Sequence, residues 1–175
     1  MDKVSEQIKS KIRAVNDFPK KGIVFRDITT ALKDASTLSL IVDRLASEFT
    51  GKIDLVVAIE SRGFIFGMPL AYKLGAGFVP IRKRGKLPAE TYCASYDLEY
   101  GSDTIEMHKD AIEKGQTVLL VDDLLATGGT AKSACELITK AGGKLIASAF
   151  LIELTALNGK EKLKNTAPVF SLIKY

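Results

Sequence analysis

The residues best suited to chemistry lie in one stretch, VLLVDDLLATGGT, which runs from Val118 to Thr130. An apolar segment is followed at once by Asp122 and Asp123, and then by a Thr-Gly-Gly-Thr sequence that precedes a predicted helix. The amide groups and the dipole at the start of a helix favour an anion, and glycines let the backbone approach it closely. The Thr127–Thr130 segment therefore indicates a phosphate site, although a tight turn without a ligand has the same pattern.

The two acids need a different partner, because a carboxylate repels a phosphate. Ionised carboxylates only accept hydrogen bonds, so they suit hydroxyl groups or a divalent cation. A sugar phosphate offers both features, with its phosphate on the glycine loop and its ring hydroxyls on Asp122 and Asp123. The alternative is that one or both acids cap a helix or face solvent.

Short apolar segments predict the elements that must position these residues. Four segments lack polar alternation, as buried parallel strands do, namely 54–59, 78–81, 118–121 and 145–152. Helical periodicity predicts helices over 3–15, 37–49, 64–74 and 130–141. Asp34 or Ser36 is expected to cap the second helix, and Pro69 to kink or delay the third. This order predicts an α/β fold with a mainly parallel sheet.

Ligands bind at the carboxyl ends of the strands in such sheets. The first two predicted strands lead into ESRGFIFG and RKRGKLP, whose arginines, lysines and glycines suit a second anion. The fourth leads into ELTALNG. Before the third strand, a long polar segment predicts either a hairpin or a mobile loop.

Composition limits the class of protein. The chain has 175 residues, is 46% hydrophobic and carries a net charge of +4, which favours a small anionic ligand over nucleic acid. No apolar run approaches the ~20 residues that cross a bilayer, and the charged N-terminus has no signal-peptide pattern. Cys93 and Cys135 lack metal or redox spacing, and His108 has no catalytic partner pattern. A single cytoplasmic domain is expected.

VLLVDDLLATGGT resembles the phosphoribosyl pyrophosphate motif of the type I phosphoribosyltransferases. Further stretches are similar to the members of that family that use adenine, along nearly the whole chain: FPKKGIVFRDIT, ESRGFIFG, IRKRGKLPAETYCASYDLEYG and IELTALNGKEKL. The resemblance implies one domain over 1–175, with a central, mainly parallel sheet flanked by helices. It also implies a small N-terminal hood and base-binding segment at 1–34, and a mobile catalytic loop at 84–104.

The resemblance also implies an activity. Phosphoribosyl pyrophosphate and adenine would give AMP and pyrophosphate in purine salvage, with Mg²⁺ and in a cytoplasmic homodimer. Most of the Mg²⁺ ligands would come from the substrate, with Asp122 and Asp123 as candidate protein ligands. A non-proline cis peptide is expected at Glu60-Ser61 by the same analogy.

The site residues are assigned from the same motifs. Glu99 would be the general acid/base, with Tyr100 packing beside it over the ring or ligand. The 5′-phosphate would be held by Ala126, Thr127, Gly128, Gly129 and Thr130, and the ribose by Asp122 and Asp123. Pyrophosphate would be held by Ser61, Arg62, Gly63, Arg82, Arg84 and Lys86, with Lys86 favoured over Lys83. The base would contact Val24, Phe25, Arg26 and Leu154, although Phe25 also suits the core.

Two alternatives stay open. One is a phosphoribosyltransferase for xanthine or another base, but relatives that act on 6-oxopurines carry an acid where this chain has Ala126. The other is a non-catalytic sensor of phosphoribosyl pyrophosphate. Such sensors usually add a DNA-binding helix-turn-helix, for which 175 residues are expected to leave no room.

Overall fold

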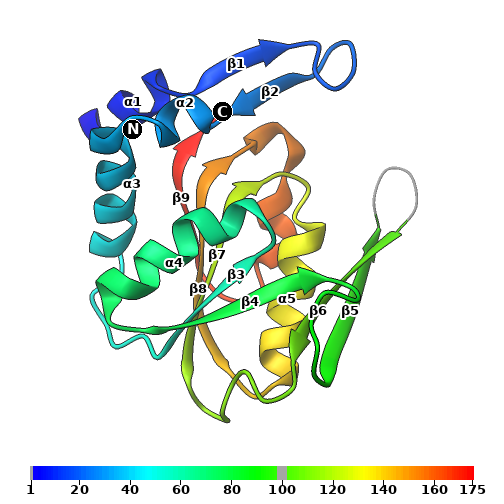
Figure 1. The fold of residues 1–175 in the computed structure, drawn as a ribbon. Helices are drawn as coiled ribbons and strands as arrows, with labels where there is room; N and C mark the ends of the chain where they lie inside the picture. The colour runs from blue at the N-terminus through cyan, green and yellow to red at the C-terminus, as the bar shows by residue number, and fades with distance from the viewer. Residues whose placement is uncertain (1, 98–101) are drawn as a thin grey trace. The chain divides into compact units, whose positions relative to one another are not determined.

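The computed structural model describes residues 2–97 and 102–175, which fall into two compact units, Met1–Glu48 and Phe49–Tyr175. The first unit contains α1 (Lys3–Ser10), β1 (Arg13–Asn16), β2 (Val24–Asp27), α2 (Thr29–Leu32) and α3 (Ala35–Ser47) (Figure 1). Strands β1 and β2 pair in antiparallel fashion. Helix α3 begins after Asp34, whose carboxylate accepts a hydrogen bond of 2.8 Å from the Thr37 amide, as an N-cap should.

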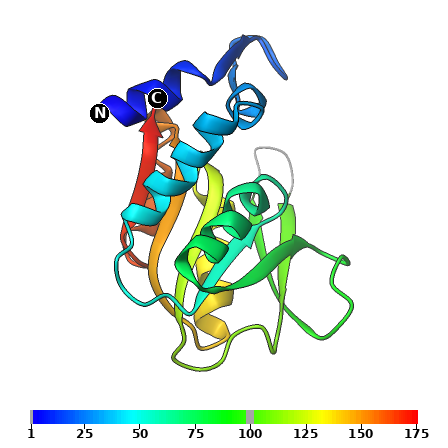
Figure 2. The same ribbon diagram turned by 60° about the vertical axis from the view of Figure 1, so that its left-hand side comes forward.

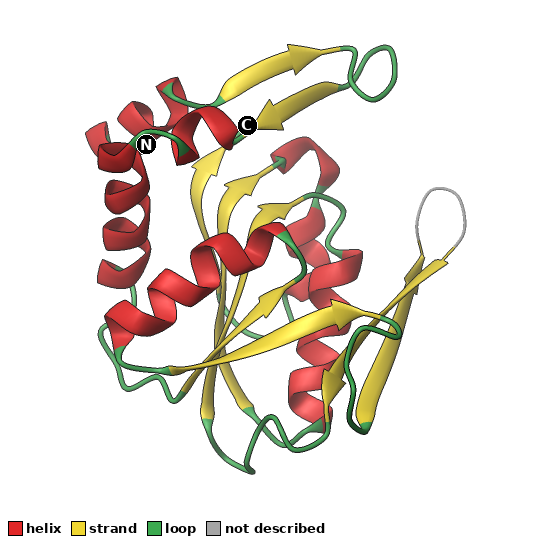
Figure 3. Ribbon diagram, viewed as in Figure 1, coloured by secondary structure: helices red, strands yellow, loops and turns green. Residues whose placement is uncertain are grey.

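The second unit is built on a seven-stranded sheet with the order β5-β6-β4-β3-β7-β8-β9 (Figure 3). The strands from β4 to β9 in that order are parallel, and β6 of the β5–β6 hairpin pairs with β4 in antiparallel fashion. Its elements are β3 (Leu55–Ile59), α4 (Arg62–Leu74), β4 (Gly77–Lys83), β5 (Thr91–Asp97), β6 (Ser102–His108), β7 (Thr117–Leu125), α5 (Gly129–Lys140), β8 (Lys144–Glu153), the 3₁₀ helices η1 (Thr155–Leu157) and η2 (Gly159–Leu163), and β9 (Val169–Lys174).

The central strands are buried because helices cover both faces of the sheet (Figures 1 and 2). The β3–α4–β4 connection moves along the sheet in one direction, and the β7–α5–β8 connection in the other. Right-handed crossovers in opposite directions place α4 and α5 on opposite faces. Val57 of β3 and Leu120 of β7 are consequently 0% exposed. Within the described residues, no helix combines the length and the apolar character that spanning a bilayer demands.

Most of the predicted elements are present, and the predicted α/β fold class is confirmed. Helix α4 begins at Arg62 and continues through Pro69, so the delayed start predicted for it is wrong. The predicted helix over 3–15 is also wrong in its second half, since α1 ends at Ser10 and Arg13–Asn16 pairs with β2. Hydrophobic periodicity in one segment does not reveal that a partner strand exists elsewhere in the chain. Here the backbone hydrogen bonds between β1 and β2 outweigh the local preference of residues 13–15 for a helix.

Two further differences bear on the site. Strand β7 continues beyond the predicted end at Val121 to Leu125, because β8 pairs with it along that length, so both aspartates lie within the strand. Between β4 and β7, residues 91–97 and 102–108 form the β5–β6 hairpin. Strand β9 had no counterpart in the prediction.

Candidate active site

The site lies where the two crossover connections diverge, at the carboxyl ends of the neighbouring strands β3 and β7. This is the topological switch point at which open α/β sheets bind ligands. A pocket of about 550 Å³ opens there. Its lining combines acids, bases and hydroxyl groups: Ile59, Glu60, Ser61, Arg62, Lys83, Lys86, Tyr96, Asp122, Asp123 and Thr130.

The turn after β3 brings one side of the pocket close to β7. The expected cis peptide is present at Glu60-Ser61, and α4 begins at the next residue, Arg62. A side chain at Gly63 would bring a carbon within 2.9 Å of Asp122 Oδ1, so a glycine is needed for the turn to approach this strand. The turn therefore presents Ser61 and Arg62 directly beside the acids of β7.

Asp122 and Asp123 are held differently although they are neighbours. The Arg62 Nε atom lies 2.9 Å from Asp123 Oδ2, whereas Asp122 Oδ1 accepts a hydrogen bond of 2.8 Å from the Asp123 amide. Burial raises the pKa of Asp122 well above its usual range, and the adjacent Asp123 charge raises it further. Burial also raises the pKa of Asp123, while Arg62 opposes the rise. Hydroxyl donors or a cation would favour the charged forms of both carboxylates.

The loop after β7 has the geometry of an anion site. Gly128 caps α5 in a left-handed conformation with φ of 78°, which a glycine adopts without strain. This cap has no side chain that could accept hydrogen bonds from the amide groups of the first turn of α5, which suits an anion there. Thr130, on that first turn, lines the pocket.

Gly159 of η2 packs against the backbone of the loop between β7 and α5. A carbon added to Gly159 would collide with the Ala126 carbonyl oxygen, and one added to Gly128 would collide with the Gly159 carbonyl oxygen. The backbones of the two segments therefore pack directly against each other. The shape of the loop between Ala126 and Thr130 consequently depends on η2, which is remote in sequence.

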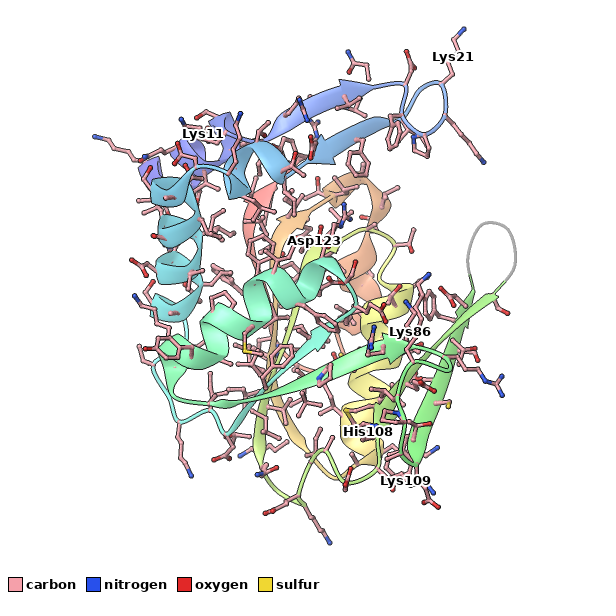
Figure 4. The ribbon with its side chains drawn as sticks, viewed as in Figure 1. Lys11, Lys21, Lys86, His108, Lys109 and Asp123 are labelled. Carbon is pink, nitrogen blue, oxygen red and sulfur yellow. The ribbon has the colours of Figure 1, made fainter. Side chains whose placement is uncertain are left out.

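The basic residues that follow β4 meet two acids. Arg82 and Lys86 both contact Glu60, with Arg82 Nε 3.2 Å from Oε2 and Lys86 Nζ 2.7 Å from Oε1. Burial raises the pKa of Glu60, but the hydrogen bonds from Lys86, Arg82 and the Lys83 amide outweigh it and lower the pKa to about 2. Lys83 Nζ lies 3.2 Å from Asp103 Oδ2 on the hairpin. Figure 4 labels Lys86, in the loop after β4, and Asp123, on β7, and both line the pocket.

The structure brings together many of the predicted site residues, but not all of them. Arg84 is exposed, does not line the pocket, and donates its backbone amide to the Thr104 carbonyl. Leu154 follows β8, and its amide bonds to the Leu125 carbonyl at the end of β7. Glu99 and Tyr100 lie outside the described residues.

The predicted base-binding residues Val24, Phe25 and Arg26 belong to β2 in the first unit. Val24 is 42% exposed, so an apolar surface is available there to a ligand. Phe25 packs edge-on against Phe18, with 5.3 Å between the ring centroids. This contact agrees with a packing role for Phe25.

Several residues of the site were not predicted. Glu60 was noted only for its peptide bond, and Tyr96 and Gly159 were not singled out. The Tyr96 hydroxyl donates a hydrogen bond of 3.3 Å to Asp103 Oδ2, and burial raises the pKa of Tyr96. A signal was present for Glu60, because an acid between a strand end and a glycine turn, near a basic cluster, is a natural counter-ion. No local pattern indicated Gly159.

Comparisons with known proteins agree with this geometry. Residues 29–174 match the phosphoribosyl transferase domain family. An adenine phosphoribosyltransferase from Clostridium novyi is 55% identical over 169 residues, covering 96% of this chain and 98% of the relative. The crystal structure of adenine phosphoribosyltransferase from Thermoanaerobacter pseudethanolicus has a TM-score of 0.94 at 53% identity, covering 98% of this chain and 99% of that one. The Saccharomyces cerevisiae enzyme, crystallised with an imino-altritol bisphosphate and adenine, has a TM-score of 0.91 at 42% identity, covering 97% and 98%.

The substitution Gly159→Ala should weaken the binding of ribose 5-phosphate by about tenfold, because the new methyl group would displace the Ala126–Gly128 backbone, which is expected to face the phosphate. Isothermal titration calorimetry would measure the loss. Gly51→Ala is the matched control, since a carbon there meets nothing within 4 Å. Unchanged affinity in Gly159→Ala would show that η2 does not shape the loop.

Proposed function

The chain belongs to the phosphoribosyltransferase family, and from that premise we propose that it transfers the phosphoribosyl group of phosphoribosyl pyrophosphate to adenine, giving AMP and pyrophosphate in purine salvage. The observation that carries the choice of adenine is the set of adenine-specific relatives, which are more than half identical over nearly the whole chain. The pocket supports it, since an anion loop, paired acids and a basic cluster meet there.

Each part of the substrate has a complementary part of the pocket. The loop from Ala126 to Thr130 would hold the 5′-phosphate through the amides of α5 and the threonine hydroxyls. Asp122 and Asp123 would accept hydrogen bonds from the ribose hydroxyls. The pyrophosphate would face a group of basic and small residues: Ser61, Arg62, Gly63, Arg82, Lys83 and Lys86, with Arg84 retained as a candidate from the sequence.

The residues of this chain then have distinct tasks in the reaction. The bond from the anomeric carbon to pyrophosphate breaks as a bond to an adenine ring nitrogen forms, so positive charge develops on the sugar and negative charge on the leaving group. Cations such as Lys86 stabilise the leaving group, and a covered site keeps water from the sugar. Segment 84–104 is the candidate cover. Glu99 would take the proton that adenine loses, and Tyr100 keeps the role beside it that the sequence predicts.

Mg²⁺ is the proposed cofactor. Among the described residues, no group of three or more acidic, histidine or cysteine side chains is placed to hold a metal ion. Mg²⁺ keeps several waters and takes one or two carboxylates together with substrate oxygens, so Asp122 and Asp123 fit the role of minority ligands. When bound with the substrate, the ion would offset the negative charge of pyrophosphate as it leaves.

Base selection is assigned to Val24, Arg26 and Leu154, with Phe25 supporting them. Adenine has an exocyclic amine donor and no carbonyl oxygen, so backbone carbonyl and amide pairs suit it. Ala126 stands where relatives that act on 6-oxopurines carry an acid, which favours adenine over hypoxanthine, guanine and xanthine. A cytoplasmic location remains a prediction from the sequence.

A homodimer is the proposed assembly, and α4 supports it. Ile65, Met68 and Tyr72 follow a helical spacing and are 40%, 53% and 89% exposed. Side chains at this spacing share one face of a helix. A second copy of the chain would bury this apolar face.

AMP formation tests the reaction and the acid/base assignment. With Mg²⁺ and phosphoribosyl pyrophosphate, we expect turnover of adenine and little turnover of hypoxanthine, guanine or xanthine. Glu99→Gln should lower kcat by about 10²–10⁴-fold, because a general acid/base contributes that much. Glu136→Gln, on the exposed surface of α5, is the control. Turnover of a different base would change the substrate, and binding of phosphoribosyl pyrophosphate without turnover of any base would favour a sensor.

Removal of the metal ion tests the cofactor. Chelation with EDTA should abolish AMP formation and weaken the binding of phosphoribosyl pyrophosphate, because the pocket itself carries acids that repel it. Added Mg²⁺ should restore both the rate and the affinity measured by calorimetry. Full activity after exhaustive chelation would contradict a requirement for Mg²⁺.

A charge on α4 tests the assembly. Met68→Glu should convert a dimer into monomers, because an unpaired charge would be buried against an apolar face. Sedimentation velocity gives the mass directly, and Glu136→Lys on α5 serves as a control with a surface charge change. A Met68→Glu protein that remains a dimer would show that another surface forms the interface.

A further inference from the structure

Glu60 lies at the pyrophosphate side of the pocket, and both of its carboxylate oxygens are engaged. Oε1 accepts hydrogen bonds from Lys86 Nζ at 2.7 Å and Arg82 Nη2 at 3.3 Å. Oε2 accepts from Arg82 Nε at 3.2 Å and from the Lys83 amide at 3.0 Å. The Glu60 side chain is 11% exposed, so this carboxylate is enclosed by its donors.

A carboxylate at this position needs an explanation. The pocket is expected to receive the pyrophosphate group, and a negative charge beside that group repels it. The bonds from Lys86, Arg82 and the Lys83 amide also outweigh burial and keep the pKa of Glu60 low, at about 2, so the charge persists at neutral pH. The repulsion is tolerable only if Glu60 contributes something that the binding of the anion requires.

Glu60 contributes by fixing the position of the Lys86 side chain, whose backbone is held separately. Its amide donates to Glu106 Oε1 at 3.0 Å, and its carbonyl accepts from Arg82 Nη1 at 3.3 Å, so the backbone is fixed on both sides. Glu106 is 4% exposed, which makes the first of these bonds a buried one. The long Lys86 side chain is itself about half exposed, and its contact with Glu60 fixes where its ammonium lies.

Glu60 also allows the side chains of Arg82 and Lys86 to lie close together in spite of their like charges. Arg82 and Lys86 would repel each other if they faced the pocket without a counter-ion, and each would turn toward solvent. Hydrogen bonds to a common carboxylate remove that repulsion and fix both directions at once. A site that is ordered before its ligand arrives loses less freedom when it binds.

We propose that Glu60 is a positioning residue for the pyrophosphate group, holding Lys86 in the lining of the pocket and Arg82 beside it before the substrate binds. The inference rests on the proposed function, since it takes phosphoribosyl pyrophosphate as the substrate. It predicts a selective effect. Ligands that carry pyrophosphate depend on Glu60, whereas AMP, which lacks that group, does not.

The variant Glu60→Gln tests this selectivity. It removes the charge and replaces one carboxylate oxygen by an NH2 group, so the two donors to that oxygen lose their acceptor while the remaining carbonyl oxygen still accepts. We expect the Kd of Mg²⁺-pyrophosphate and the KM for phosphoribosyl pyrophosphate to rise about tenfold, as for the loss of a charged hydrogen-bond network. The Kd of AMP should stay within about twofold. Glu60→Asp, which keeps the charge on a shorter side chain, should recover part of the pyrophosphate affinity.

Two further variants sharpen the test. Glu136→Gln makes the same chemical change in a carboxylate that also pairs with a lysine, Lys132 at 3.8 Å, outside the pocket, and should bind both ligands as the unmodified protein does. Lys86→Gln alone should weaken pyrophosphate binding. Combined with Glu60→Gln, it should weaken it by less than the product of the two single effects, because Glu60 acts through Lys86.

Each outcome is decisive. If Glu60→Gln weakens AMP and pyrophosphate equally, the residue maintains the fold and the proposal is wrong. It is also wrong if pyrophosphate binds equally well or more tightly, since repulsion would then be the dominant effect. If the double variant shows fully multiplied effects, Glu60 does not act through Lys86. An unmodified protein that binds neither ligand and forms no AMP would instead overturn the proposed function itself.

Discussion

The site depends on one structural constraint, the parallel pairing of β3 with β7 in the centre of the sheet. Leu55 to Ala58 lie opposite Val118 to Val121, so the turn that follows β3 lies beside Asp122 and Asp123 of β7. Because the connections from these strands run in opposite directions, no crossover covers the point where they end. The Glu60–Gly63 turn and the aspartates of β7 are therefore brought together by the strand pairing itself. Substitutions that shift this register would therefore move the acids relative to the bases.

Charge pairing is the second organising feature, and it makes binding an exchange of partners. The cations that line the pocket already have acidic partners, with Arg62 on Asp123, Lys83 on Asp103 and Lys86 on Glu60. An incoming polyanion competes with these carboxylates for the same donors. Its gain is the difference between two sets of interactions, which suits an enzyme that must release pyrophosphate after each turnover.

The sequence predicted local features better than distant ones. The paired aspartates, the parallel strands and the glycine-rich start of α5 each have a short signature, and the structure places Asp122, Asp123 and Thr130 around one pocket. The second half of the helix predicted over 3–15 became β1, because its pairing partner, β2, lies beyond an intervening turn. Gly159 supports the loop at Gly128 from a separate segment, so no local pattern could indicate it. The unpredicted part of the site thus consists of contacts between segments that are remote in sequence.

The three acids that line the pocket are in different electrostatic states, and this difference divides their roles. Glu60 has enough donors to lower its pKa to about 2, so it remains charged and holds cations. Burial raises the pKa of Asp122, and its pairing with a second acid adds to the rise. The donors of Asp122 and Asp123 do not outweigh the effect of burial, because the pKa of each carboxyl is raised. Ribose hydroxyls or a metal ion would supply what these two need, whereas Glu60 gains nothing from either. Under the proposed function, the sugar hydroxyls would accordingly be directed to β7 and the leaving group to the turn after β3, which would set the orientation of the substrate in the pocket.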